Sequence, residues 1–303
     1  NIAETAVLGI KACFPDSIIG FIPYENKADV RFVKYCLETY KLQMQALSKG
    51  ATQDNLSLEK LRSLNFLIPK IDEQRKIANI LYSYDKLIQN NTKRISILEQ
   101  MAEQLYKEWF VRMRFPNYEN TKFVKGVPEG WEIETLDSVS KILKGKNITK
   151  ETVKEGFVPV VAGGLSPAYY HNKSNTKSPT ITISASGANA GFVNLYFEDI
   201  WASDCSFIDT RSSNYLYFTY LTLKVRQQEI YHLQRGSAQP HVYPKDIKRV
   251  GLFLPPENLL KNFEKLMIPV FEEIQNLKFQ VQNLKKTRDL LLPRLISGKL
   301  KIE

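Results

Sequence analysis

The stretch DEQRKIANILYSYDKLIQNNTKRISILEQMAEQLYKEWFVR, from Asp72 to Arg112, decides the fold, because no Gly or Pro interrupts it. Apolar residues recur along it at alternating steps of four and three, which is the coiled-coil period and is narrower than an ordinary surface-helix face. The residues of this stripe, here called the seam, are Ile77, Leu81, Tyr84, Ile88, Ile95, Leu98, Ala102, Leu105 and Trp109, with Asn91 as the polar member. Such a helix would be roughly 50 Å long at 1.5 Å per residue, and its narrow seam requires a partner helix.

A second copy of this helix lies later in the same chain. Shifting the sequence by 186 positions (236 − 50) lays Gly50 on Gly236 and Pro69 on Pro255, and no gap is needed from Phe21 to Leu105. The same shift carries the seam onto Phe263, Met267, Val270, Ile274, Leu277, Val281, Leu284, Arg288, Leu291 and Leu295. The matching loops indicate a duplicated unit and not two unrelated amphipathic helices. We therefore expect the two long helices to pair in antiparallel fashion as a coiled coil.

Composition and charge limit the class of protein. A chain of 303 residues with 43% hydrophobic content is long enough for two or more globular domains. No apolar run approaches the length of a membrane span and no signal peptide is present, so we expect a cytoplasmic protein without membrane contact. Cys13, Cys36 and Cys205 are scattered, which favours a reducing compartment and argues against structural zinc. The formal charge of +10 is compatible with a phosphate-binding surface.

The repeat predicts five segments along the chain. They are a partial first domain at 1–70, a central long helix at 71–115, a linker at 116–130, a second domain at 131–256 and a C-terminal long helix at 257–303. The first domain is expected to be incomplete, because position 187 aligns with Asn1 and about 56 residues of the second domain (187 − 131) have no counterpart. The predicted fold is mixed α/β (α+β), with two pseudo-repeated domains joined by two long antiparallel coiled-coil helices.

Short strands and one further helix are predicted in each domain. The first domain is expected to have strands at 7–12, 18–22 and 65–68 and a helix over 28–47. The second is expected to have strands at 132–139, 158–162, 180–184, 191–196, 206–209 and 250–254. Asn214 can cap a helix over 215–230, and Pro269 is expected to kink or split the second long helix.

Several short motifs follow one another in an order typical of one protein family. The second domain opens with VPEGW, continues to a GSAQPHV loop and a strand ending LPP, and closes with RLISGKL, while LIPKIDEQRKIANIL stands at the centre. This order resembles the specificity subunit of Type I restriction–modification enzymes. The resemblance implies two target-recognition domains at opposite ends of the helix pair, each reading one half of a bipartite site in double-stranded DNA. It also implies methyltransferase subunits, two per chain, and restriction–translocase subunits as partners, with no cofactor and no catalysis in this chain.

Helix length favours the same interpretation. Helices of about 50 Å exceed one B-DNA turn of about 34 Å, so two half-sites separated by an unread spacer are expected. Because the two domains differ in sequence between the shared elements, the two half-sites should differ as well.

The polar loops of the second domain hold the candidate DNA-binding residues. Lys and Arg can contact phosphates or guanine, while Asn, Gln, Ser and His can read base edges. The candidates are Lys144, Lys146, Asn147, His171, Asn172, Lys173, Ser186, Asn189, Arg235, Ser237, Gln239 and His241. For each loop the alternative is a solvated surface turn, and Gln239 has a twin at Gln53 that favours a structural turn shared by both domains.

Two other functions stay open at this point. Asp16, Glu25 and Lys27 match the spacing of a metal-dependent nuclease, but the repeat-equivalent residues include Ala202 and Arg211, so the match is weak. No methyltransferase or P-loop motif occurs, and the three histidines lack metal-ligand spacing. A helical scaffold without DNA binding would explain the seam but not the basic loops.

Apolar residues outside the seam predict docking surfaces for partner subunits. They are Ile80, Leu87, Met101, Tyr106 and Phe110 on the first helix and Leu266, Phe271, Phe279 and Leu292 on the second. Part of this set must pack on the globular domains, and the remainder should form two similar docking sites.

Overall fold

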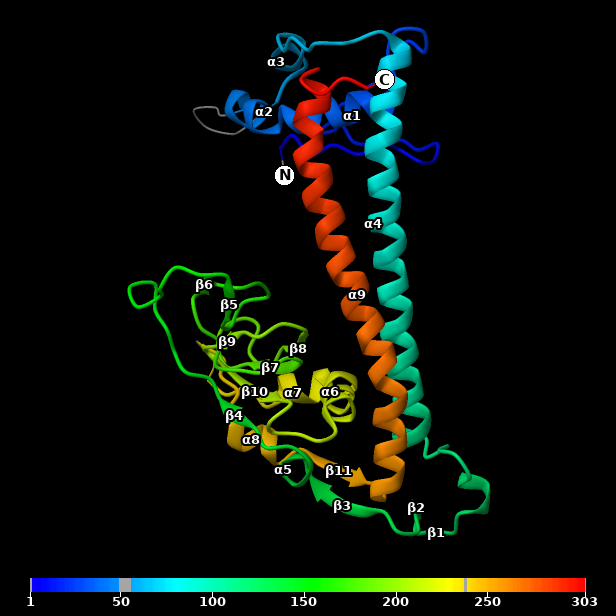
Figure 1. Ribbon diagram of the computed structural model, residues 1–303, viewed down its shortest axis with the longest axis vertical. Helices are drawn as coiled ribbons and strands as arrows, with labels where there is room; N and C mark the ends of the chain where they lie inside the picture. The colour runs from blue at the N-terminus through cyan, green and yellow to red at the C-terminus, as the bar shows by residue number, and fades with distance from the viewer. Residues whose placement is uncertain (1, 49–55, 237–238, 303) are drawn as a thin grey trace. The chain divides into compact units, whose positions relative to one another are not determined.

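The computed structural model describes residues 2–48, 56–236 and 239–302, and the chain divides into two compact units. The first unit combines residues 1–95 with 276–303, and the second unit is the continuous segment 96–275. Both units contain part of each long helix, α4 (Ile71–Tyr106) and α9 (Glu257–Ile296) (Figure 1). A single π-helical turn, Lys107–Val111, continues α4.

The two long helices are antiparallel within each unit. In the first unit the Asn91 side chain donates to Gln280 at 3.0 Å, and Arg288 pairs with Asp85 at 2.5 Å. In the second unit the rings of Phe110 and Phe263 lie 4.8 Å apart. Residue numbers fall along one helix as they rise along the other, which confirms the predicted antiparallel pairing.

The residues of the predicted seam are buried or half-buried, and the degree of burial differs between them. Its buried members are Ile77, Leu81, Ile95 and Ala102 on α4, Trp109 in the π-helical turn that follows, and Phe263, Met267, Ile274, Leu277 and Leu295 on α9. The other apolar members are half-buried: Tyr84, Ile88, Leu98, Leu105, Val270, Val281, Leu284 and Leu291. Asn91 is buried among them, whereas Pro269 is exposed. The expectation that Pro269 would split the helix was wrong, because α9 is continuous across it.

Helix positions confirm the duplication. The starts of α1 (Val30–Thr39), α2 (Lys41–Ser48), α3 (Leu58–Arg62) and α4 each recur 186 residues later (216 − 30). The recurring helices are α6 (Leu216–Val225), α7 (Gln227–His232), α8 (Pro244–Lys248) and α9. The repeat therefore fixes where helices begin in both halves.

The first unit has a small helical core. Buried side chains of α1 pack against the first turns of α4 and the last turns of α9, and the set is Phe32, Tyr35, Cys36, Ile77, Ala78, Leu81, Leu295 and Ile296. Gln74 is fully buried, accepts the Asp29 N–H at 3.0 Å and donates to Lys27 O at 2.9 Å. Asp29 in turn caps α1 by accepting the Phe32 N–H at 3.0 Å.

The strands predicted in the first domain were wrong. Among the described residues no strand precedes Phe123, so 7–12, 18–22 and 65–68 are irregular. Val7, Leu8, Ile10, Ile18, Ile19, Phe21 and Ile22 are exposed. A strand needs a neighbouring strand for its backbone hydrogen bonds, and none pairs with these segments in the described part of the unit. The helix predicted over 28–47 is interrupted at Tyr40, where α1 ends.

Apart from a two-stranded hairpin in the predicted linker, the second unit contains three small sheets (Figure 1). The central sheet has the antiparallel order β4 (Leu143–Lys144), β10 (Cys205–Asp209), β7 (Thr180–Ser184) and β8 (Val193–Tyr196). A second sheet has the order β6 (Tyr169–His171), β5 (Val158–Val161) and β9 (Trp201–Ala202), with β5 and β9 parallel. The third pairs β11 (Gly251–Leu254) with β3 (Glu132–Thr135). Every residue of β7 and β10 is buried, so the central sheet is the core of this unit.

The sequence predicted the longer strands of this unit and missed the short ones. The strand predicted at 132–139 ends at Thr135, where the short helix α5 (Leu136–Val139) begins. The predicted linker contains a 3-10 turn (Tyr118–Asn120) and a hairpin of β1 (Phe123–Val124) and β2 (Val127–Pro128). The limits predicted for the five segments stay predictions.

The cap predicted for α6 was also wrong. The N-cap residue is Tyr215 and not Asn214, and its side chain makes no capping bond. Instead the Glu264 carboxylate of α9 accepts the N–H groups of Tyr217 at 2.8 Å and Phe218 at 3.1 Å. Burial raises the pKa of Glu264 above its ordinary value. A residue 47 positions away in sequence thus caps this helix, which a local pattern could not indicate.

Candidate nucleic-acid interface

Three of the predicted loops meet at one end of the central sheet. Ser184 at the end of β7 lies opposite Cys205 at the start of β10. The loop after β4 reaches this end, since Gly145 N–H donates to Cys205 O at 2.8 Å. Residues after Ser184 contact the loop that follows α7, because Gly187 N–H donates to Pro240 O at 3.1 Å. Candidates from 144–147, 184–189 and 235–241 are therefore brought together.

Close backbone packing holds the first of these loops in place. A Cβ atom at Gly145 would lie 2.2 Å from Ser203 O, so only glycine allows this approach. Trp201 Nε1 donates to Lys146 O at 2.8 Å. Lys144, Lys146 and Asn147 are exposed, so their side chains are free to meet a ligand while their backbone is held.

The loop after β7 has its polar side chains engaged within the unit. The Ser186 hydroxyl donates to the Asp204 carboxylate, and Asn189 Nδ2 donates to Gly163 O at 3.3 Å. Both side chains are half-buried. These bonds shape the loop, and either residue would have to share its polar atoms to read a base.

Arg235 is held by a buried carboxylate. Its Nη2 lies 2.7 Å from Asp246 Oδ1, and the side chain of Asp246 is only 6% exposed, against 61% for Arg235. Asp246 Oδ2 has no partner among the described residues. The backbone of Arg235 pairs with that of His241 through two bonds of 2.9 Å. The guanidinium is therefore oriented and still keeps N–H groups for a ligand.

The remaining candidates of this loop differ in accessibility. Gln239 is exposed, and its carbonyl oxygen lies 2.8 Å from His241 Nδ1. His241 is half-buried, with its ring 6.1 Å from that of Tyr243. Gly236 has φ +91°, a conformation that favours glycine. Ser237 lies outside the described residues.

The side chain of His171 is buried, which argues against the predicted contact of His171 with DNA. His171 Nδ1 accepts the Lys154 N–H at 3.0 Å, and the ring lies edge-on against Trp201 with 5.0 Å between ring centres. The imidazole therefore supports the turn before β5. Its neighbours Asn172 and Lys173 are exposed and stay candidates.

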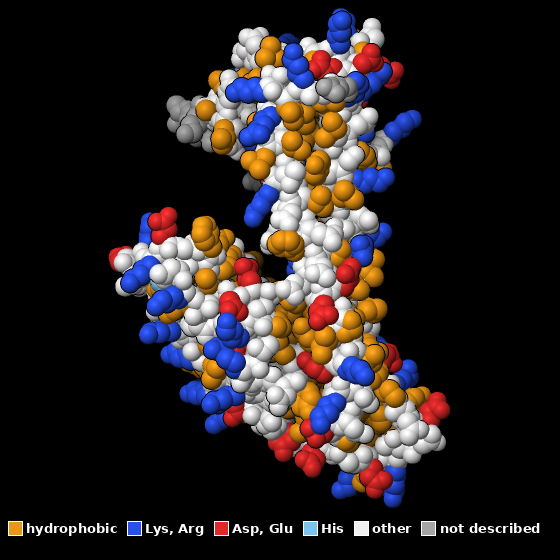
Figure 2. Space-filling model, viewed as in Figure 1, with side chains coloured by type: hydrophobic (Ala, Val, Ile, Leu, Met, Phe, Trp, Pro, Cys, Tyr) orange, Lys and Arg blue, Asp and Glu red, His pale blue; other side chains and the backbone are white. Residues whose placement is uncertain are grey.

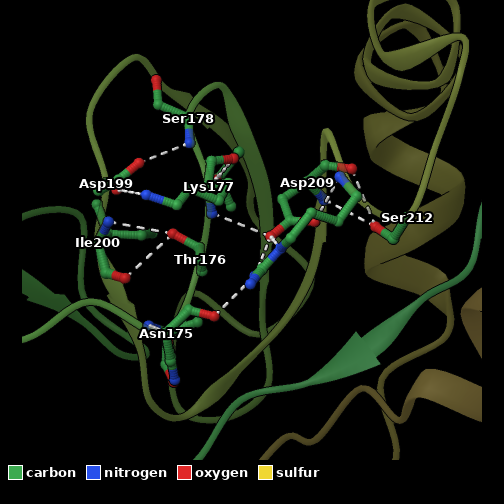
Figure 3. Close-up of polar contacts among 11 residues, drawn as sticks. Asn175, Thr176, Lys177, Ser178, Asp199, Ile200, Asp209 and Ser212 are labelled. Atoms are coloured by element: carbon green, nitrogen blue, oxygen red, sulfur yellow. Dashed lines mark hydrogen bonds and ion pairs between the residues drawn. The ribbon is translucent and has the colours of Figure 1, made fainter.

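A further arginine, Arg211, which the sequence did not single out, lies at the opposite end of the central sheet. Asp209 is fully buried and accepts Arg211 Nε at 2.9 Å and the Lys177 N–H at 3.0 Å, and Figure 3 shows Lys177 beside Asp209. Arg211 Nη2 also donates to Asn175 O at 2.9 Å. Beside them the Lys177 ammonium, 2.8 Å from Asp199, lowers the pKa of that carboxyl. Only the tertiary pairing of these segments reveals this network.

Lysines gather in one stretch of the second unit. Residues 141–177 contain seven lysines and two glutamates, Glu151 and Glu155, and all seven lysines are exposed. Figure 2 shows Lys and Arg side chains along one edge of the β-rich domain, at the lower left. Local net charge, which is legible in the sequence, would have marked this stretch.

The nuclease hypothesis gains no support from the first unit. Asp16, Glu25 and Lys27 are all exposed, and no cluster of three or more His, Cys, Asp or Glu side chains that could hold a metal occurs in the described chain.

None of the described helices combines the length and apolar composition needed to cross a membrane.

Fold and site together define a class of protein: a long antiparallel helix pair that carries a β-rich domain with basic loops. The chain belongs to the family described as the Type I restriction modification DNA specificity domain, whose family model matches residues 1–100 and 128–283.

Relatives and solved structures agree with this family. The chain is 31% identical over 293 residues to the Type I restriction enzyme MjaIX specificity subunit of Methanocaldococcus jannaschii, covering 88% of this chain and 67% of that protein. It is 25% identical over 302 residues to the putative MjaX specificity subunit of the same organism, covering 93% and 70%. The fold is similar to the crystal structure of a Type I S subunit from M. genitalium, with a TM-score of 0.62 and 20% identity over 89% of this chain and 73% of that one.

Proposed function

We propose that the chain is a sequence-specific DNA-binding subunit of a Type I restriction–modification assembly. Its second unit would read one half of a bipartite, asymmetric target in double-stranded DNA. The observation that carries the proposal is the convergence of three loops, with Lys144, Lys146 and Arg235, at one end of a rigid sheet. Lysines can bind phosphates at any sequence, and an oriented arginine can discriminate guanine. The long helices would set the length of the unread spacer.

Partner subunits would supply the chemistry. Of the apolar residues outside the seam, Tyr106, Phe110 and Phe271 are buried in the second unit, and Ile80 and Leu292 pack on the core of the first. Four stay exposed on the long helices: Leu87, Met101, Leu266 and Phe279. We propose that they dock methyltransferase subunits, two per chain, and that restriction–translocase subunits join through the complex in the cytoplasm. The chain itself would need no cofactor and perform no catalysis.

A gel-shift series across salt concentration tests the DNA-binding proposal. Methylation sequencing of a strain carrying the system would supply the target for the duplex. Affinity should fall linearly in a double-logarithmic plot against salt, because each phosphate contact releases counterions. A helical scaffold without DNA binding would give no shifted band at any salt concentration.

Arginine and lysine substitutions separate base reading from phosphate binding. Arg235→Ala should cost about 1–3 kcal/mol of binding free energy and relax one target position, whereas Lys146→Ala should weaken all sequences alike. Arg211→Ala is the matched control, since it also removes an arginine from a buried aspartate but at the other end of the sheet. Selection from randomised duplexes measures both effects. If the Arg235 variant keeps the base preferences of the parent and only binds more weakly, Arg235 contacts phosphate and does not read a base.

A further inference from the structure

Phe157 is the most exposed large apolar side chain in the described chain. It is 95% exposed, and it directly precedes β5, the central strand of the second sheet. Burial of a phenylalanine ring stabilises a folded protein, and Phe157 forgoes this stabilisation. An aromatic ring in such a position requires a physical reason.

The backbone around Phe157 is held too firmly for the ring to turn inward. A Cβ atom on Gly156 would lie 2.3 Å from His171 O, so the two segments are in direct contact. Val158 pairs with His171 across β5 and β6, and the Lys154 N–H is bonded to the imidazole of the same histidine. Because His171 is itself buried against Trp201, these contacts fix the turn at residues 154–157, and Phe157 projects outward from it.

The residues around Phe157 indicate a ligand that has many negative charges and also apolar surfaces. Lys154 lies in this turn and Lys173 follows β6, and both belong to the stretch of seven exposed lysines. A second aromatic side chain of the same sheet, Tyr170 in β6, is 56% exposed. The centres of protein–protein interfaces are depleted in charged residues, whereas duplex DNA offers phosphates beside stacked bases.

We propose that Phe157 inserts between adjacent base pairs of the bound duplex while the neighbouring lysines neutralise its phosphates. The proposal rests on the proposed DNA-binding function and adds a second kind of target recognition. Apolar wedges partly unstack a base step, and the cost depends on the step, with TA and CA/TG the easiest to open. Phe157 therefore makes the chain prefer a flexible step at a position that no hydrogen bond reads.

Thymine oxidation by permanganate tests this wedge directly, because the reagent attacks unstacked thymines and each flexible step contains one. The experiment uses the full chain on a duplex carrying the target mapped by methylation sequencing. The bound duplex should show a hyperreactive thymine that is lost in Phe157→Ala, together with about tenfold weaker binding, given the value of aromatic stacking on a base. Phe157→Leu should retain the reactive thymine, since leucine also acts as a wedge.

Ile133→Ala is the matched control, because Ile133 is 78% exposed in the same unit but on the sheet of β11 and β3. It should leave both affinity and thymine reactivity unchanged. Salt-dependent DNA binding with a thymine pattern that ignores Phe157→Ala would overturn the wedge and leave the proposed function intact. Absence of any shifted band for the parent chain would overturn both.

Discussion

The two halves of the helix pair have the same backbone plan and different contact chemistry. On the side of the first unit, Asp85 of α4 pairs with Arg288 of α9 and also accepts the Tyr35 hydroxyl at 2.5 Å. The repeat-equivalent positions in the second unit are Phe271 and Ala102, which are both buried. An ion pair in one half therefore corresponds to two buried apolar residues in the other.

The second unit also has a cluster of aromatic contacts around its part of the helix pair. The ring of Phe271 stacks on Tyr217 at 4.4 Å, and Phe263 lies within 5.5 Å of the rings of both Trp109 and Phe110. Duplication has thus preserved the positions at which helices start, while the side chains between them have changed freely. The seam positions follow from the helical period, and several kinds of contact between the helices satisfy that period.

Removal of a core aromatic side chain should lower the free energy of unfolding more than the other substitutions do. This would show that the stability of the second unit depends on its aromatic side chains. Phe263→Ala should cost about 3–5 kcal/mol in unfolding free energy, because it leaves a cavity among fully buried side chains. All three tryptophans, Trp109, Trp131 and Trp201, lie in the second unit, so their fluorescence during urea unfolding follows that unit.

The matched variant is Ile77→Ala, the repeat-equivalent change in the first unit. It should cost about 2–4 kcal/mol there and leave the tryptophan transition unchanged. Hydrogen exchange of α1 amides follows the first unit. An equal shift of the tryptophan transition in both variants would contradict the independence of the two cores.

Loss of the ion pair should have a smaller effect. Asp85→Ala leaves the Tyr35 hydroxyl without its acceptor and the Arg288 guanidinium with only the exposed Asp289, and both groups lie in a partly buried setting. The expected cost is about 2 kcal/mol, as for a hydrogen-bonded charged group, measured by hydrogen exchange in α1. Asp289→Ala is the control, because Asp289 also contacts Arg288 but its side chain is 60% exposed. The control should change stability by less than about 0.5 kcal/mol; an equal loss in both variants would rule out a special role for Asp85.

The sequence predicted the helix pair because the signal there is long and is present twice. A seam repeated over more than four heptads leaves few alternatives, and the second copy checks the first. Short strands such as β4 and β9 have two residues each and carry no period, so they were missed. The false strands before residue 70 were short apolar runs, but pairing depends on a neighbouring strand and not on local pattern.

The candidate site was predictable in residue type and not in accessibility. Lys144, Lys146 and Asn147 have the residue types of the predicted loop and are exposed. His171 looked equivalent in sequence, but it is buried by Trp201, which lies 30 residues away (201 − 171). Arg211 was missed because its carboxylate partner is positioned by sheet packing. Burial of a polar side chain is a tertiary property, and short motifs do not encode it.

The smallest expected effect comes from making the polar half of the seam resemble its apolar counterpart. Asn91 is buried in the seam and donates to Gln280, whereas the repeat-equivalent residue of Asn91 is Leu277. A polar residue at such a position fixes register at some cost in stability. Asn91→Leu should therefore raise the unfolding free energy of the first unit by up to about 1 kcal/mol. Gln280 is exposed, so its amide returns to water and no buried polar group is left unpaired.

Asn90→Leu is the control for this change, because Asn90 is exposed and lies outside the seam. Hydrogen exchange in the α4 segment of the first unit should show slower exchange for Asn91→Leu and no change for Asn90→Leu. If Asn91→Leu instead destabilises the unit by more than about 1 kcal/mol, the bond to Gln280 contributes net stability. In that case the hydrogen bond between Asn91 and Gln280 stabilises the first unit by more than a buried leucine would. Asn91 would then contribute to stability as well as fixing the register of the two helices.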